Sequence, residues 1–160
     1  MKNTKLTHVD SLGNPSMVNV SEKPVTKRTA KAQAVVNVGR EIISLVQGDE
    51  LTTKKGPVFQ TAILAGIMGA KKTSDLIPLC HPLGLDDCQI TIRAAGEDVV
   101  ITSTATLSAK TGVEMEALTA ATVAALTIYD MCKALSHEIV IKEVKLLEKT
   151  GGKKDFKLLK

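Results

Sequence analysis

Asp130 and Lys133 stand three residues apart in a segment with a helical pattern, so their side chains are neighbours on one helix face. Such a pair is either a stabilising ion pair or an acid–base couple, because each group shifts the pKa of the other. Glu116 lies on the same face but roughly 21 Å away at about 1.5 Å rise per residue, too far to form one carboxylate dyad. We therefore expect two sites, two ends of one long ligand, or a second subunit that places the ends in different pockets.

The element that must position these groups is a long helix within Lys110–Ala134. After Gly112 the segment contains no glycine or proline and is rich in Ala, Leu, Met, Val and Ile, which favours a helix. Its polar residues fall within an arc of roughly 140°, and they are Glu116, Thr119, Thr122, Thr127, Asp130 and Lys133. Because apolar residues fill most of the remaining circumference, we expect a buried helix whose polar stripe faces a cleft, a partner or solvent.

Cys80 and His81 lie in an apolar loop that contains two prolines, Asp75 to Leu85, which we expect to pack inside the protein. A buried thiol beside a hydrogen-bonded imidazole is the simplest interpretation. Adjacent residues rarely point correctly for nucleophilic catalysis, and the cysteines and histidines show no CxxC or HxxxH spacing for a metal. A histidine in a rigid pocket could still donate to a phosphate or act as an acid or base near neutral pH.

Lysines are the other candidates for chemistry, and most of them are expected to be solvated surface residues. Lys55 is the best candidate among them, because Gly56 lets backbone approach closely and a helix N-terminus beyond it favours an anion. The GxxxxGK[ST] and GxGxxG phosphate motifs are absent. The lysines considered are Lys54, Lys55, Lys71, Lys72, Lys133, Lys149, Lys153 and Lys154.

The composition is that of a water-soluble globular protein of 160 residues, with 44 % apolar and 24 % charged residues and a net charge of +4. Aromatic residues make up 2 %, which argues against RNA or single-strand recognition by stacking. Three cysteines do not form a disulfide framework, and neither an apolar leader nor a membrane-spanning run is visible. We expect a cytoplasmic protein that binds neither nucleic acid nor membrane.

The order of elements predicts one α+β domain over residues 1–160 with a ferredoxin-like βαββαβ fold, in which helices cover one face of an antiparallel sheet. Residues 1–28 are expected to be an extended arm and residues 149–160 a flexible basic tail. Alternation predicts strands, and helical patterns predict a short and a longer helix before the long one. The strands are 29–38, 88–94, 99–107 and 139–147, the last with a bulge near Glu143, and the two helices are 41–46 and 58–72. Residues 49–55 between the two helices are expected to be a polar loop. Gly66 and Gly69 in the second helix suggest a close approach of another element.

Four segments closely resemble the molybdenum cofactor biosynthesis protein C family, the cyclic pyranopterin monophosphate synthases. They contain the distinctive runs LIPLCHPL, TGVEMEALTA and LTIYDMCKA, and they are Thr7–Arg28, Ala65–Leu85, Thr111–Ala134 and Lys149–Phe156. The resemblance covers essentially the whole chain. It implies a homohexamer, a trimer of dimers, with active sites at subunit interfaces.

The resemblance also implies a lyase reaction on a small nucleotide-derived substrate supplied by a separate radical enzyme. The substrate would be 3′,8-cyclo-7,8-dihydroguanosine 5′-triphosphate, and the products cyclic pyranopterin monophosphate and diphosphate. It implies that Asp130 is the catalytic acid/base, with Lys133 beside it, and that Lys55 is a catalytic cation suited to the triphosphate and the leaving diphosphate. The implied substrate contacts are Leu79, Cys80, His81, Met115, Glu116, Lys71, Lys149 and Arg28. No cofactor and no dedicated metal site are expected, and Mg²⁺ bound with the triphosphate stays open.

Three residues depart from the family motifs: Asn19 where MVDVS has Asp, Pro57 where KGDV has Asp, and Ile63 where TARIAG has Arg. They put in doubt the local hydrogen bonding of the arm and the first long helix, and any anion contact at position 63. Three alternatives stay open. They are a catalytically inactive family member that acts as a binding subunit, a ferredoxin-like nucleic-acid binder, and a Cys/His metal site.

Overall fold

The computed structural model describes residues 8–10 and 12–159, so residues 1–7 and 11 of the expected arm and Lys160 of the expected tail lie outside it. Its main sheet is antiparallel, with strand order β5-β6-β1-β7-β8. The strands are β1 (Thr26–Asn37), β5 (Asp87–Ala95), β6 (Asp98–Ala109), β7 (Val140–Thr150) and β8 (Phe156–Lys157). Among the described residues the helices are α1 (Gly39–Ile43), α2 (Val58–Lys71), α3 (Thr73–Leu76) and α4 (Glu114–Cys132).

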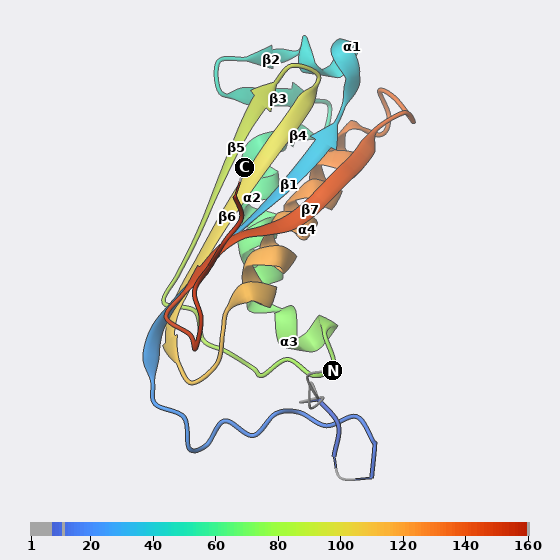
Figure 1. The fold of residues 1–160 in the computed structure, drawn as a ribbon. Coiled ribbons are helices and arrows are strands. Elements are labelled where there is room, and N and C mark those ends of the chain that lie inside the picture. Colours follow the sequence, from blue (N-terminus) through green and yellow to red (C-terminus); the bar gives the residue numbers. More distant parts are fainter. Residues whose placement is uncertain (1–7, 11, 160) are drawn as a thin grey trace.

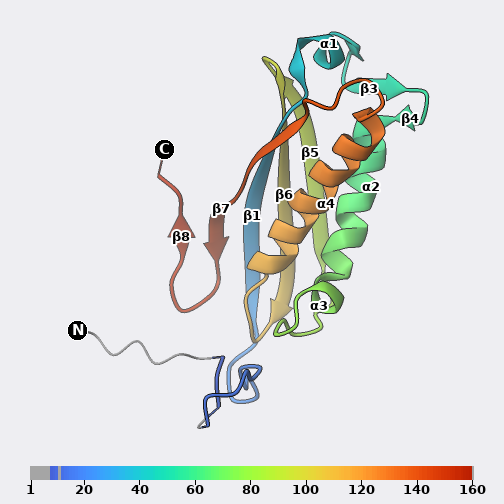
Figure 2. The same ribbon diagram turned by 90° about the vertical axis from the view of Figure 1, so that its right-hand side faces the viewer.

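The path β1-α2-β5-β6-α4-β7 confirms the predicted βαββαβ arrangement. Seen along the sheet edge, α2 and α4 cover one face of the sheet (Figure 2). The strand pattern explains this, because Ala30, Ala32, Ala34 and Val36 of β1 point into the core while Lys31 between them does not. Alternation in the sequence therefore determined which face of the sheet the helices cover.

Close packing of α2 on α4 depends on the two glycines of α2, as the sequence suggested. A Cβ on Gly69 would lie 2.7 Å from Cγ2 of Val123, and one on Gly66 would lie 2.8 Å from the carbonyl oxygen of Ala120. Both distances are below ordinary van der Waals contact, so only glycine allows the two helices to approach this closely.

The strand β7 contains the predicted bulge. Its register with β1 shifts between Val35 and Val36, next to Glu143, and again between Lys31 and Ala32. Each shift leaves an extra residue on β7, which reverses the face that the following side chains occupy.

Two expectations about loops were wrong. Residues 49–55 are not simply a loop, because β2 (Val46–Gln47), β3 (Glu50–Thr53) and β4 (Gly56–Pro57) form a small second sheet. This small sheet lies at the end of the molecule opposite α3 and the arm (Figure 1). The loop 75–85 is not packed inside, since its residues are half-buried or exposed and Leu76 is 57 % exposed. Beyond the end of α3 at Leu76, it forms no helix or strand and lies at the surface beside the arm.

The tail also differs from its expected form over the described residues. β7 continues through Thr150, and β8 pairs with it, Lys157 lying opposite Glu148. The turn between them starts at Gly151, whose φ of +82° suits glycine, and the Gly151 N–H donates to Oδ1 of Asp155 at 3.1 Å. Similarly, Thr26 to Arg28 belong to β1 rather than to a free arm.

Candidate functional site

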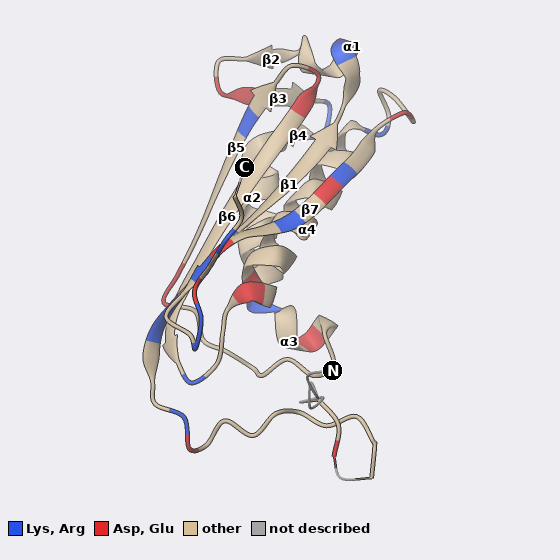
Figure 3. Cartoon of the chain, in the orientation of Figure 1, with Lys and Arg blue, Asp and Glu red and all other residues tan. Residues whose placement is uncertain are grey.

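Helix α4 carries candidate groups at both of its ends. Glu116 in its first turn is 3 % exposed and Thr119 is 8 % exposed, so the first part of the polar stripe is buried against the rest of the chain. Asp130 and Lys133 at the other end are exposed. Acidic and basic residues also alternate along β7, whereas the ribbon of β6 is uncharged over most of its length (Figure 3).

At the C-terminal end of α4, two ammonium groups hold one carboxylate. Lys133 Nζ lies 2.8 Å from Oδ1 of Asp130, and Lys55 Nζ donates to Oδ2 of the same residue at 2.8 Å. Lys55 also donates to the main-chain carbonyl of Asp130 at 2.8 Å. The predicted Asp130–Lys133 pair is thus a three-residue cluster, because the small sheet brings in Lys55.

The cluster has a defined protonation state at neutral pH. Hydrogen bonds from Lys133 and Lys55, together with their charges, lower the pKa of Asp130 to about 2. The hydrogen bond to Asp130 and its charge raise the pKa of Lys133. Asp130 is therefore ionised at neutral pH, although its lowered pKa makes it a weaker base than an isolated aspartate, and Lys133 beside it is a cation able to stabilise negative charge.

A cavity of about 480 Å³ lies at the N-terminal end of α4. Five of the residues expected to contact substrate line it, and they are Leu79, Cys80, His81, Met115 and Glu116. The arm closes part of it, because His81 Nε2 lies 2.8 Å from the carbonyl oxygen of Val18. A carbonyl only accepts, so Nε2 of His81 carries a hydrogen.

Burial changes the acidity of two groups in this cavity. It raises the pKa of Glu116, and the nearby charge of Glu114 acts in the same direction. Burial also raises the pKa of the Cys80 thiol, again with help from a carboxylate, Glu116. Glu116 can therefore hold or exchange a proton closer to neutral pH than an exposed glutamate can, while the thiol is protonated and a poor nucleophile.

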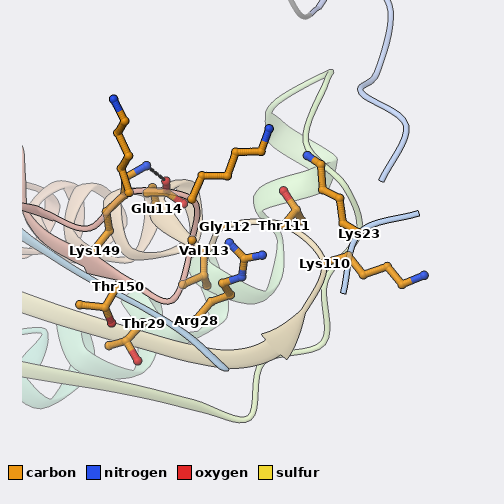
Figure 4. A pocket seen from close by; sticks show the side chains of 13 residues that line it. Lys23, Arg28, Thr29, Lys110, Thr111, Gly112, Val113, Glu114, Lys149 and Thr150 are labelled. Carbon is orange, nitrogen blue, oxygen red and sulfur yellow. Dashed lines mark hydrogen bonds and ion pairs between the residues drawn. The ribbon is translucent and has the colours of Figure 1, made fainter. Parts of the chain in front are cut away.

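A second cavity of about 410 Å³ adjoins the first, and its lining contains six cationic residues (Figure 4). Lys149 crosses to α4 and pairs with Oε1 of Glu114 at 2.8 Å. Burial opposes ionisation of Glu114, but the hydrogen bond from Lys149 and the charges of Lys149 and Arg28 outweigh it and lower the pKa of Glu114. The cationic residues lining the cavity are Lys23, Arg28, Lys110, Lys149, Lys153 and Lys154.

Arg28 brings a guanidinium to this cavity, and a guanidinium can bind an anionic ligand through two oxygen acceptors. Its Nε is buried and has no hydrogen-bond partner among the residues that the structure describes. Both cavities share Lys23, Thr111, Gly112 and Glu114, so one extended ligand could reach from the first into the second.

The sequence of this chain matches the MoaC family over residues 17–152. The chain belongs to the MoaC family. It is also 50 % identical over 155 residues to a protein of Drosophila melanogaster named Molybdenum cofactor biosynthesis protein 1. That alignment covers 96 % of this chain but 27 % of the Drosophila protein, so the chain spans about a quarter of the length of that relative.

The departures from the MoaC motifs have local structural consequences. Asn19 keeps an acceptor, since its Oδ1 accepts a hydrogen bond from the Ser21 N–H at 2.8 Å. Ile63 packs partly buried against the core, so no cation stands at that position. Pro57 occupies the N-cap of α2 and provides no side-chain cap.

Not every expected residue joins these groups within one chain. Lys71 is exposed at the end of α2 and is not among the described residues that line either cavity. The charge of Lys71 acts on the thiol of Cys88. Burial raises the pKa of this thiol, and the charge of Lys71 opposes the rise. The Lys55–Asp130–Lys133 cluster also lies outside both linings, about 21 Å along α4 from Glu116 by the rise of the helix.

Several polar residues that line the cavities were not among the expected site residues, and they include Lys23, Lys110, Thr111 and Glu114. The sequence could have indicated Glu114 as a site residue, because it stands two residues before Glu116 in the same GVEMEAL run. Lys153 and Lys154 had been noted only as tail lysines. Pairing of β8 with β7 folds the turn that carries them back over the cavity.

Two further observations concern other classes of site. Within residues 8–10 and 12–159, no three His, Cys, Asp or Glu side chains gather as ligands for a metal ion. Over the same residues, no helix has the length and apolar character needed to span a membrane.

Proposed function

We propose that this chain is a cyclic pyranopterin monophosphate synthase and acts in molybdenum cofactor biosynthesis. The reaction converts 3′,8-cyclo-7,8-dihydroguanosine 5′-triphosphate to cyclic pyranopterin monophosphate and diphosphate, which makes the enzyme a lyase. Membership of the MoaC family and the name of the Drosophila relative support the pathway. The observation that carries the proposal is the cavity of about 410 Å³ whose lining includes Arg28 and five lysines, because this lining suits a polyphosphate.

The site residues divide into two tasks in this proposal. Lys149, Arg28 and the cations around them hold the triphosphate, and Glu116 and His81 in the adjoining cavity contact the ring system. When the cyclic phosphate closes, an oxygen–phosphorus bond forms at the first phosphate and the bond to diphosphate breaks. Negative charge grows on the leaving diphosphate, which neighbouring ammonium groups stabilise.

Asp130, Lys133 and Lys55 form the proton-transfer centre in this proposal. The carboxylate of Asp130 accepts a proton from a reacting group, and a neighbouring ammonium can return one. The cluster lies about 21 Å from Glu116 along α4. We propose that a complete site joins the cluster of one subunit to the cavities of another, within a homohexamer built as a trimer of dimers.

Several expectations stay predictions beside this proposal. They are the supply of substrate by a radical enzyme, a requirement for Mg²⁺ with the triphosphate, and a cytoplasmic location. The roles of Leu79, Cys80, Met115 and Lys71 as substrate contacts are proposals as well, and that of Lys71 needs the subunit assembly to bring it to a cavity.

Turnover by the Asp130→Asn variant tests the proposal. Purified protein is incubated with enzymatically prepared cyclic dihydroguanosine triphosphate, and the cyclic pyranopterin phosphate and diphosphate are quantified. We expect wild type to form both products and Asp130→Asn to retain its fold but lose about 10²–10⁴-fold in kcat, as for removal of an acid–base group.

Asp75→Asn is the matched control, because Asp75 also forms an exposed ion pair three residues away on a helix, with Lys72 at 3.4 Å. It should turn over at the wild-type rate. A near-normal rate for Asp130→Asn would remove Asp130 from the mechanism. Folded, hexameric wild type that forms no product would favour a non-catalytic binding subunit.

A further inference from the structure

Lys55 is carried by the small sheet and not by either long helix. It lies in the turn between β3 and β4, and its ammonium reaches across to the last turn of α4, where it donates to Oδ2 and to the main-chain carbonyl of Asp130. The small sheet sits over the adjacent ends of α2 and α4 (Figure 2). The position of Lys55 therefore depends on how firmly the small sheet is attached to these helices.

Glu50 attaches the small sheet to α2. Its Oε1 accepts a hydrogen bond from the Phe59 N–H at 2.7 Å, and its Oε2 accepts one from the Gln60 N–H at 3.1 Å. Both N–H groups belong to the first turn of α2, where no helical carbonyl is available to accept from them. Since Pro57 at the N-cap provides no side-chain cap, the carboxylate of Glu50 caps α2 from a neighbouring strand.

Two buried anchors make this connection rigid. Leu51, next to Glu50, is fully buried, and its N–H also donates to Oε1 of Glu50 at 2.8 Å. Phe59 at the other side is 3 % exposed. Between the anchors, Thr53 pairs with Gly56 across the turn, and the Thr53 hydroxyl accepts a hydrogen bond from the Lys55 N–H at 3.2 Å. The turn that presents Lys55 is thus held at both of its ends.

We propose that Glu50 is a positioning residue for the reaction, whose carboxylate fixes the small sheet on the N-terminus of α2 and so holds Lys55 against Asp130. Its effect on turnover rests on the proposed function. Glu50 contacts neither Asp130 nor the cavities at the other end of α4. Loss of the carboxylate should therefore act through Lys55 and leave substrate binding in the cavities intact.

Steady-state kinetics on three variants test this role. A misplacement of about 1 Å in a catalytic group can cost roughly 10²-fold in rate, so we expect Glu50→Ala to lower kcat about 10–100-fold with KM close to wild type. Glu50→Gln keeps the shape and one acceptor oxygen and should recover part of this loss. Glu41→Gln is the control, because Glu41 is an exposed glutamate of the adjacent helix α1, and it should match wild type.

Labelling of lysines supplies a readout that does not need turnover. Limiting acetylation followed by mass spectrometry gives the labelling of Lys55 relative to its exposed neighbour Lys54. The two hydrogen bonds to Asp130 protect Lys55 in wild type, so the ratio should rise in Glu50→Ala, rise less in Glu50→Gln, and stay unchanged in Glu41→Gln.

The two readouts separate the possible failures. A kcat of Glu50→Ala equal to wild type overturns the proposal, and so does a lower kcat with an unchanged labelling ratio, because the loss is then not transmitted through Lys55. If wild type makes no product, the proposed function fails while the ratio still decides the role of Glu50. A raised ratio supports that role and an unchanged one overturns it.

Discussion

Gly66 lies where α2 packs tightly against α4 and β5. A Cβ at this position would overlap Cδ1 of Ile90 and would lie 2.8 Å from the carbonyl oxygen of Ala120 and 3.3 Å from Cβ of Ala124. The terminal methyl of Ile90 can rotate away. The carbonyl of Ala120 is backbone, however, and it cannot retreat unless α4 itself moves. We therefore predict that Gly66→Ala forces α2 and α4 apart.

Two opposing contributions determine the change in the free energy of unfolding. Alanine in place of glycine gains about 1 kcal/mol of helix propensity. Overpacking a close-packed interior costs about 1–3 kcal/mol. The cost here lies at or above the upper end, because the carbonyl oxygen of Ala120 belongs to the backbone and cannot rotate away. We expect a net loss of about 2 kcal/mol or more, which lowers Tm by at least about 4–8 °C for a domain of this size.

Urea unfolding followed by far-UV circular dichroism, at one fixed protein concentration, measures this loss. Gly84→Ala is the matched control, because a Cβ there meets no atom within 4 Å, and we expect its stability to be unchanged or slightly higher. A Gly66→Ala variant as stable as wild type, or more stable, would refute the close-packing argument.

Two further predictions follow from acidity and burial. The folded-state pKa of Asp130 is about 2 against an ordinary 3.8, so its ion pairs stabilise the fold above pH 3.8, and this contribution is lost as the pH falls through about 2. Urea unfolding at several pH values should show wild type losing more stability over that range than Asp130→Asn, and equal losses would contradict the ion pairing. Burial raises the pKa of Cys132 to about 11, so iodoacetamide should alkylate it more slowly than the half-buried Cys80 and Cys88, as read by mass spectrometry. Preferential labelling of Cys132 would show that α4 is not packed as described.

The main elements could be predicted because their signals are local. Alternation over β1 and the unbroken helical pattern of α4 both reflect contacts between residues two to four apart in the chain. The bulge near Glu143 was also readable, since the apolar face of β7 changes there. The small sheet was missed because its strands are too short to show a period, and its Gly and Lys residues are typical of a loop.

The site residues were named from family motifs, and the structure arranges them into two groups that the motifs do not distinguish. Asp130 and Lys133 could be paired from their spacing alone. The resemblance named Lys55 as a catalytic lysine but did not place it in this cluster, because its partner Asp130 lies 75 residues away in the chain. The role of Glu50 had no signal in the sequence, since a glutamate before a turn is ordinarily a solvated residue.

By itself the sequence determined the βαββαβ order, the buried face of each strand and the polar stripe of α4, because side-chain direction follows directly from the helix and strand periods. Only the tertiary structure decided that Lys55 reaches Asp130, that Lys149 reaches Glu114, and that the β7–β8 turn places cations over a cavity. These contacts depend on where distant segments meet once the sheet has closed and α2 has packed on α4. Strand register, the bulges of β7 and the glycines Gly66 and Gly69 determine where these segments meet. The helix and strand periods of the sequence do not encode this.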